Sequence, residues 1–126
     1  MTTTASIRSA PPLSTVRRAG DLLFVSGQLP RGPGGDIVPG DIVVQARRSL
    51  ANLEAALLKS GASLKDVVKV TVWLTDVAYV DGFNQAYREA FQEPYPARTL
   101  VVSGLVAGDV EVEAVALAPS LAPGRP

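Results

Sequence analysis

Residues 110–117, VEVEAVAL, decide how this chain folds, because the strand that they predict carries apolar side chains on both faces. Successive side chains of a strand point to opposite faces, so Glu111 and Glu113 share one face with Val115 and Leu117. The other face is apolar throughout: Val110, Val112, Ala114 and Ala116. Helices can cover that apolar face, but the mixed face keeps apolar surface that nothing in a small domain buries. This pattern predicts a homo-oligomer.

Two amphipathic helices are predicted before this strand. In residues 41–60 apolar side chains recur at steps of three and four, with Asp41 placed to cap the first turn and Gly61 to end the last one. Residues 79–91 repeat the amphipathic pattern, which stops before Pro94 because the residue before a proline avoids helical backbone. Both helices therefore have one face suited to packing on a sheet.

Three further strands are predicted at residues 22–26, 67–74 and 99–103. The alternation in 67–74 assigns Lys69 and Thr71 to one face. The other face is then Val68, Val70, Val72 and Leu74. Two helices packed against a sheet of four or more strands make a two-layer α+β domain.

The length of 126 residues is that of a single domain, with a core at about residues 12–118. Residues 1–11 and 119–126 are expected to form a loosely ordered arm and tail, since the first is mostly polar and the second holds three prolines. Residues 30–40 contain three prolines and four glycines, and are expected to be either a functional lid or a plain connector.

The composition excludes several classes of function. Twelve basic residues balance twelve acidic ones, which argues against nucleic acid as the partner because phosphate binding needs a basic surplus or stripe. The absence of Cys and His excludes a thiolate nucleophile, an imidazole base and the usual zinc sites. The same absence predicts that the protein needs no metal. No apolar run could span a membrane and the N-terminus has no apolar signal segment, so a cytoplasmic protein is expected.

Four features of the sequence are candidates for chemistry, each with an ordinary structural alternative. Arg98 follows two prolines that stiffen its backbone, which suits bidentate capture of a carboxylate or merely an arginine at a strand edge. Glu111 and Glu113, two residues apart on one strand face, suit acid–base catalysis or a solvated surface. Residues 26–28 could bind an anion through backbone N–H groups or simply form a turn, and Asn84 could bond to a strand or face solvent.

Taken together, these residues are more specific than any one of them. They occur in a characteristic order and spacing: Ser26-Gly27-Gln28, Gln45, Asn84-x-x-Tyr87 followed by Phe91, Pro96-Ala97-Arg98, and Glu111-x-Glu113-Ala114-x-Ala116. In this the sequence resembles the Rid/YjgF family of small reactive-intermediate deaminases, from about residue 12 to residue 117. The P-A-R element and the E-x-E-A-x-A ending are the most specific parts of the resemblance.

The resemblance implies a chorismate-mutase-like α+β fold with two helices on one face of a mixed sheet, assembled as a homotrimer around a central barrel with clefts between subunits. It also implies hydrolysis of small carboxylated enamines and imines to 2-keto acids and ammonia, without metal or cofactor. Arg98 matches the arginine that binds the substrate carboxylate, and Glu111 matches the acid that positions water. Residues that match the lining of the cleft are Ser26, Gly27 and Asn84.

Two positions depart from the family pattern. Leu13 stands where the family usually has a tyrosine that faces the cleft, and Leu100 stands where many members have a cysteine. Both changes predict a more apolar cleft and a larger apolar substrate. Two alternatives remain open: an enzyme dedicated to a bulkier carboxylated intermediate of one pathway, and a non-catalytic regulator that binds a carboxylated metabolite through Arg98.

Overall fold

The computed structural model describes residues 10–120, in which five strands form one sheet in the order β1-β2-β5-β3-β4. Strands β3 and β4 are parallel, whereas the other neighbouring pairs are antiparallel. The strands are β1 (Val16–Ala19), β2 (Leu22–Gln28), β3 (Val67–Leu74), β4 (Ala97–Val102) and β5 (Val110–Leu117). The loosely ordered arm and tail expected at residues 1–11 and 119–126 lie almost entirely outside the described residues.

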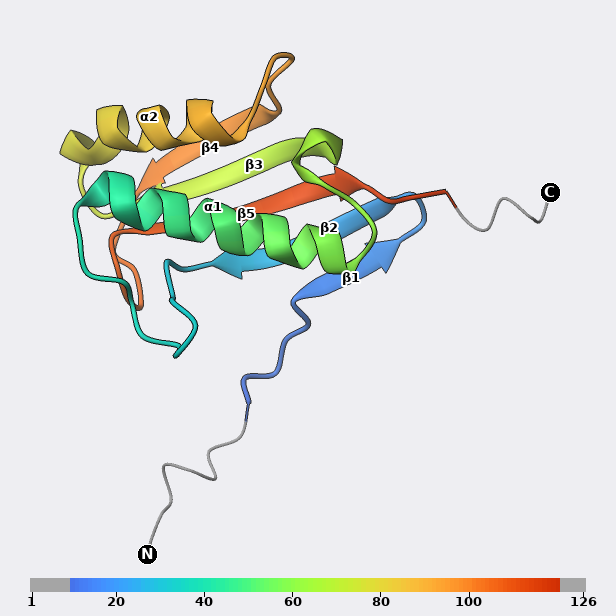
Figure 1. The fold of residues 1–126 in the computed structure, drawn as a ribbon, viewed down its shortest axis with the longest axis horizontal. Coiled ribbons are helices and arrows are strands. Elements are labelled where there is room, and N and C mark those ends of the chain that lie inside the picture. Colours follow the sequence, from blue (N-terminus) through green and yellow to red (C-terminus); the bar gives the residue numbers. More distant parts are fainter. Residues whose placement is uncertain (1–9, 121–126) are drawn as a thin grey trace, which may run out of the picture.

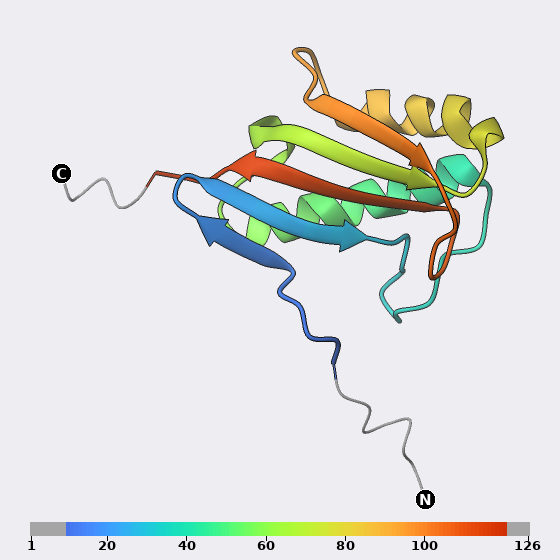
Figure 2. The same ribbon diagram turned by 180° about the vertical axis from the view of Figure 1, so that it is seen from behind.

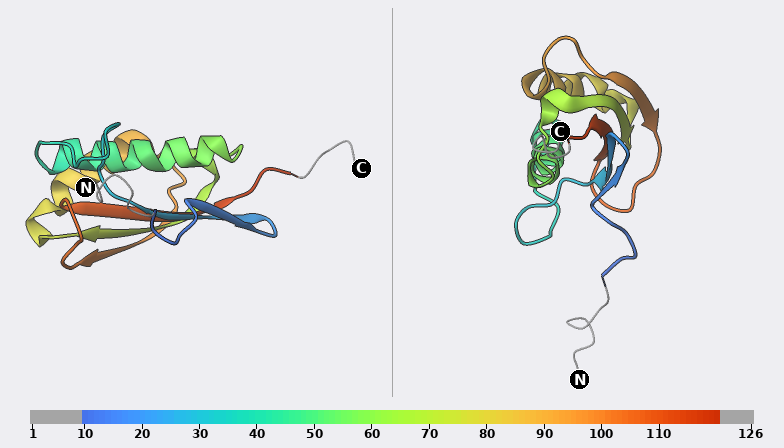
Figure 3. Two further views of the ribbon diagram at one scale, coloured as in Figure 1. Left: turned by 90° about the horizontal axis from the view of Figure 1, so that it is seen from below. Right: turned by 90° about the vertical axis from the view of Figure 1, so that its right-hand side faces the viewer.

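Helices α1 (Ile42–Lys59) and α2 (Val80–Ala90) both lie on one face of this sheet (Figure 1 and Figure 3). Single-turn 3₁₀ helices η2 (Leu64–Asp66) and η3 (Val77–Tyr79) lead into β3 and α2 respectively. The predicted two-layer α+β architecture is therefore confirmed. Within residues 10–120, neither helix is long and apolar enough to cross a membrane.

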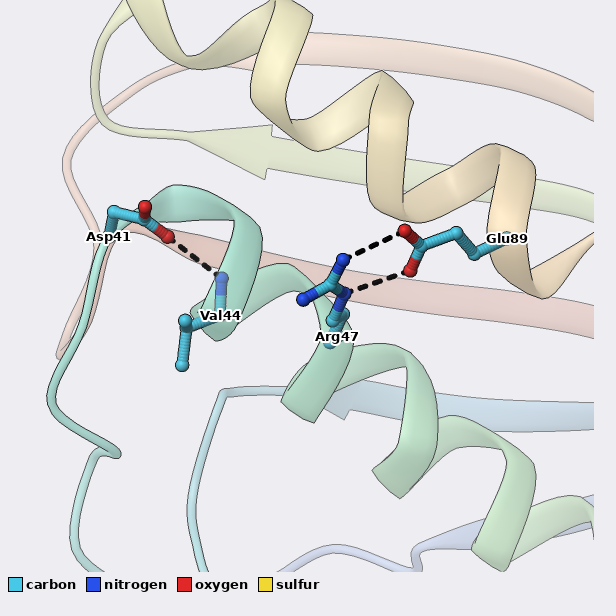
Figure 4. Close-up of polar contacts among 4 residues, drawn as sticks. All are labelled: Asp41, Val44, Arg47 and Glu89. Carbon is cyan, nitrogen blue, oxygen red and sulfur yellow. Dashed lines mark hydrogen bonds and ion pairs between the residues drawn. The ribbon is translucent and has the colours of Figure 1, made fainter.

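The ends of α1 follow from its flanking residues. The Asp41 carboxylate accepts a hydrogen bond from the Val44 backbone N–H at 3.0 Å (Figure 4), and Gly61 takes a φ of +81° beyond the last turn. On the outer surface the Arg47 guanidinium donates two hydrogen bonds of 2.8 Å to the Glu89 carboxylate of α2 (Figure 4). An exposed ion pair adds little stability, so the two helices are held mainly by their buried apolar faces.

The core lies between the helices and the apolar face of the sheet. Its largest fully buried members are Val70, Val72, Leu74, Val110 and Val112 of the sheet, with Leu53, Leu57 and Phe83 of the helices. Burying one side chain of this size contributes about 1.5–3 kcal/mol, so the helix layer is firmly attached to the sheet.

No helix covers the other face of the sheet within residues 10–120, and Figure 2 shows this uncovered face toward the viewer. Phe24 of β2 and Leu117 of β5 lie on it with 45% and 50% of their surface exposed. The two-faced pattern predicted for residues 110–117 is thus confirmed. We call this side of the sheet the open face.

Strand β3 corrects one predicted assignment. Its pairing with β5 shifts register between Val67 and Lys69, which marks a bulge. As a result Val67 is buried and Val68 is exposed, so the prediction that Val68 shares the buried face of Val70 is wrong. Simple alternation cannot show such a bulge, because it depends on the partner strand.

The boundaries of the other strands also differ from the sequence prediction. Strand β2 runs on to Gln28 through an irregularity after Val25, so residues 26–28 lie within a strand and not in a loop after it. Strand β4 begins at Ala97, which places Arg98 inside the strand and not before it. The short strand β1 was not predicted, because four residues with two arginines carry no clear pattern of their own.

The segment of residues 30–40 is an ordered connector held against α1. Arg31 and Ile37 form an isolated β-bridge within it. The Asn52 side-chain amide of α1 donates hydrogen bonds to the backbone oxygens of Leu29 at 3.1 Å and Arg31 at 3.0 Å. Of the two roles expected for this segment, the structure therefore supports the connector.

Candidate functional site

Arg98 lies on the helix side of the sheet, at its edge. Strand β4 is the edge strand, and Arg98 is in register with Val70, whose side chain is buried beneath the helices. The Arg98 guanidinium carbon lies 4.8 Å from the ring centroid of Tyr87 and 5.6 Å from that of Phe83, both on α2. A cation over two aromatic rings is attracted to their negative faces, so the rings define where the guanidinium lies.

An open cleft of about 300 Å³ surrounds this guanidinium. It is lined by Asn84, Tyr87, Arg88, Tyr95, Pro96 and Arg98. No carboxylate within residues 10–120 forms an ion pair with Arg98, since Arg47–Glu89 is the pair found there. The in-plane N–H donors of Arg98 can therefore bind an anionic group that enters the cleft. Asn84, predicted to belong to the site, lines this cleft, while Arg88 and Tyr95 were not predicted.

Leu100 lies two residues after Arg98 and on the same face of β4. It is partly buried and packs against the core, and it is not among the residues that line the Arg98 cleft. Leu100 therefore attaches β4 to the core close to Arg98.

Glu111 lies on the open face, in register with Trp73 of β3. Its carboxylate rests over Gly27, where a Cβ atom would come within 2.8 Å of the Glu111 carboxyl carbon. Glycine at this position therefore makes room for the carboxylate. Burial, and secondly the negative charge of Glu113, raise the pKa of Glu111 above its usual range.

The surroundings of Glu111 form a second cleft of about 400 Å³, lined by Trp73, Ser103, Gly104, Leu105, Val106 and Glu111. A carboxyl group with a raised pKa in such a cleft is suited to accept a proton from water or to donate one.

Leu13 and Ser26 line a third open cleft, of about 660 Å³, beside Phe24, Glu113 and Val115 on the open face. The Ser26 hydroxyl donates to the Ser14 backbone oxygen at 2.6 Å, and the Ser26 backbone N–H donates to the Thr15 oxygen at 2.9 Å. These two bonds hold the segment that precedes β1, at Ser14 and Thr15, against β2. Leu13 is thereby presented at the surface with 62% of its area exposed.

The predicted site residues thus form two groups on opposite sides of the sheet. The helix-side group is Arg98, Asn84 and Leu100, and the open-face group is Glu111, Gly27, Ser26 and Leu13. Strands β4 and β5 are two strand spacings apart, roughly 10 Å, and the registers of Arg98 and Glu111 differ by three residues, roughly another 10 Å. One chain therefore does not bring Arg98 and Glu111 together.

A polar network that the sequence predictions missed holds the loop of residues 103–109, which forms one wall of the Glu111 cleft. The Gln45 side-chain amide donates to the Asp109 carboxylate at 3.0 Å, and the Asp109 backbone N–H donates to Gln45 at 2.9 Å. The Thr75 hydroxyl donates to the same carboxylate at 2.7 Å. Gln45 belongs to the resemblance, but Asp109 and Thr75 carried no signal because they meet only where α1, β3 and β5 converge.

Comparisons with known proteins identify the family to which the chain belongs. A family model described as Endoribonuclease L-PSP matches residues 3–119. A RutC family protein of Pyrococcus abyssi is 44% identical over 108 residues, which cover 85% of each chain. TdcF of Escherichia coli, named as a candidate reactive intermediate deaminase, is 36% identical over 102 residues, which cover 79% of each chain.

Solved structures show the same fold. A crystal structure of a Thermotoga maritima protein, described as a candidate endoribonuclease, matches with a TM-score of 0.83 and 37% identity over 90% of this chain and 91% of that one. Escherichia coli TdcF with bound serine matches with a TM-score of 0.79 and 34% identity over 88% of this chain and 91% of that one. The family model spans nearly the whole domain, including both groups of predicted site residues, and the relatives cover 79% or more of the chain. The chain therefore belongs to the Rid/YjgF family.

Proposed function

We propose that this protein hydrolyses reactive enamines and imines to 2-keto acids and ammonia. The observation that carries the proposal is Arg98, held over aromatic rings in an open cleft with no carboxylate partner in the described part of the chain. Such a group is suited to a small carboxylated substrate. The name of TdcF as a candidate deaminase, and its structure with the carboxylated amino acid serine, support the same substrate class.

The proposed reaction needs little beyond orientation, because an imine carbon is already electrophilic. Arg98 holds the carboxylate, and Glu111 orients one water and takes a proton from it. The water oxygen forms a bond to the imine carbon, while the imine nitrogen accepts a proton. In the resulting carbinolamine the hydroxyl gives up its proton and the nitrogen gains one, so that the C–N bond breaks, ammonia leaves and the carbonyl of the 2-keto acid forms.

This mechanism needs two protomers, because the helix-side group and the open-face group lie on opposite sides of one sheet. The proposed assembly is the homotrimer implied by a chorismate-mutase-like fold, with the open faces turned to a central barrel. In each cleft between subunits, Arg98 would come from one protomer and Glu111 from its neighbour. The exposed apolar residues of the open face support this assembly.

Sedimentation should give about three times the chain mass if this assembly is correct. Phe24→Asp should dissociate it, because a charge would enter the apolar contact. Val77→Asp is the matched control, since Val77 is 69% exposed but lies in η3, away from the open face. A wild-type monomer at micromolar concentration would rule out the shared cleft.

Two alternative functions are proposed after the deaminase. An enzyme dedicated to a bulkier carboxylated intermediate would use the same Arg98 and Glu111, and a metabolite-binding regulator would need only Arg98. Endoribonuclease names also occur among the matches. The equal numbers of basic and acidic residues and the absence of His from the sequence argue against RNA cleavage.

The direct test is semicarbazide trapping of imines that an amino-acid oxidase generates in situ. The protein should lower semicarbazone formation, and imines of leucine or phenylalanine should be hydrolysed faster than that of alanine. Each buried methylene contributes about 0.8 kcal/mol, so three of them favour the larger substrate by tens-fold. Leu13→Tyr should narrow this preference. If the protein accelerates hydrolysis of no imine, the proposed deaminase activity is refuted. If the imines of leucine, phenylalanine and alanine are hydrolysed at equal rates, the preference for an apolar substrate is refuted.

A further inference from the structure

The ring of Tyr87 lies nearer to the Arg98 guanidinium than that of Phe83 does, and the Tyr87 hydroxyl takes no part in this contact as a hydrogen-bonding group. Its side chain is 5% exposed and its ring centroid lies 4.8 Å from the Arg98 guanidinium carbon. The Tyr87 hydroxyl is buried and has no hydrogen-bond partner among residues 10–120. A buried hydroxyl without a partner costs stability, so the hydroxyl does not explain why this side chain lies here.

Other aromatic rings hold the Tyr87 ring in place. Its centroid lies 4.6 Å from that of Phe91, 5.6 Å from that of Phe83 and 6.5 Å from that of Tyr95. Phe83 is fully buried and Phe91 nearly so. The Tyr87 ring is therefore a rigid surface fixed by α2 and the segment that follows it.

Arg98, by contrast, is exposed on an edge strand, and no hydrogen bond from the described residues restrains its guanidinium. A long side chain in such a position loses considerable rotamer entropy when it binds a ligand. A ring beneath the guanidinium face restricts the Arg98 side chain before the ligand binds, so less rotamer entropy is lost on binding. The N–H donors lie in the guanidinium plane and remain free to bind a ligand in the cleft.

We propose that Tyr87 is a positioning residue whose ring face holds the Arg98 guanidinium ready to bind a substrate carboxylate. This inference rests on the proposed function for its substrate class, but the geometry of Arg98 and Tyr87 does not depend on it. Burial raises the pKa of Tyr87 to about 12, an effect that the charge of Arg98 only partly opposes. The ring consequently stays neutral at any pH at which hydrolysis would be assayed, and acts through its face alone.

The test compares Tyr87→Phe, which keeps the ring, with Tyr87→Leu, which removes it, in the full chain. Binding of 2-oxobutanoate is measured by calorimetry, and kcat and KM by imine hydrolysis. Tyr87→Leu should raise both the Kd for 2-oxobutanoate and KM about 3- to 30-fold with a smaller change in kcat, whereas Tyr87→Phe should stay within about twofold of wild type. Tyr87→Met provides a second ringless variant should Tyr87→Leu not fold.

A double-mutant cycle separates positioning from a general structural role. In an Arg98→Ala background, Tyr87→Leu should have no further effect on the Kd for 2-oxobutanoate. An equal loss with and without Arg98, or a loss in Tyr87→Phe as large as in Tyr87→Leu, would overturn the inference. If the wild type binds 2-oxobutanoate but hydrolyses no imine, the proposed function fails while the binding arm still tests Tyr87.

Discussion

Replacing Arg98 with alanine should lower kcat/KM for carboxylated imines by about 10²- to 10⁴-fold, the effect of losing two charge-assisted hydrogen bonds to a carboxylate. The protein should still fold, because Arg98 is exposed and contributes only a stacking contact to the native structure. Arg98→Lys should also be poor, since an ammonium makes one point contact in place of a planar fork. Steady-state kinetics on trapped imines measures both variants.

Arg47→Ala is the control for this experiment. Arg47 lies on α1, on the same side of the sheet as Arg98, but it is bound to Glu89 on the outer surface and does not line the Arg98 cleft. Its loss should leave kcat/KM unchanged. Wild-type rates in Arg98→Ala, or an equal loss in Arg47→Ala, would remove Arg98 from its proposed role.

Replacing Glu111 with glutamine should slow every substrate by about 10²- to 10⁴-fold and leave the binding of 2-oxobutanoate nearly unchanged. Glutamine keeps the shape that fits over Gly27 but cannot accept a proton from water. In the wild type, kcat/KM should fall at acidic pH as Glu111 becomes protonated. That fall should lie at a higher pH than for an ordinary glutamate, because burial and Glu113 raise the pKa of Glu111.

Glu113→Gln is the matched control, since Glu113 is a neighbouring carboxylate on the same face. It should keep most of the rate but move the acidic fall to lower pH, because its negative charge is the second cause of the raised pKa of Glu111. If the fall of kcat/KM at acidic pH persists unchanged in Glu111→Gln, the group that titrates is not Glu111.

The same pKa makes a prediction about stability. A raised pKa in the folded state means that folding favours the protonated form of Glu111. The stability that the protonated Glu111 carboxyl contributes is therefore fully present below the pKa of this carboxyl in the unfolded chain. It is lost as the pH rises through the pKa of Glu111 in the folded protein. Denaturant unfolding should show Glu111→Gln gaining stability relative to the wild type over that rise.

The helices could be predicted from sequence because their signals are local. The spacing of apolar residues in 41–60, the Asp41 cap and Gly61 all act within a few turns, and the structure places α1 at Ile42–Lys59. The open face of β5 could be predicted for the same reason, since alternation along one strand shows both of its faces. Membership of the family followed from short motifs with the right spacing.

Contacts between distant segments could not be predicted. Strand β1 exists because its backbone pairs with β2, and the bulge at Val67 exists because β3 must fit against β5. The Asp109 network likewise needs three elements to meet at one point. None of these leaves a pattern within a single stretch of residues.

The sequence by itself determined the two-layer fold, the two-faced character of residues 110–117 and the identity of Arg98 and Glu111 as candidate residues. Only the tertiary structure decided that these two residues lie on opposite sides of one sheet. The side to which a strand residue points is fixed by the register of its strand against its neighbours, and a shift of one residue would reverse it. Here the register of β4 on β3 turns Arg98 toward Tyr87, and the register of β5 on β3 turns Glu111 to the open face.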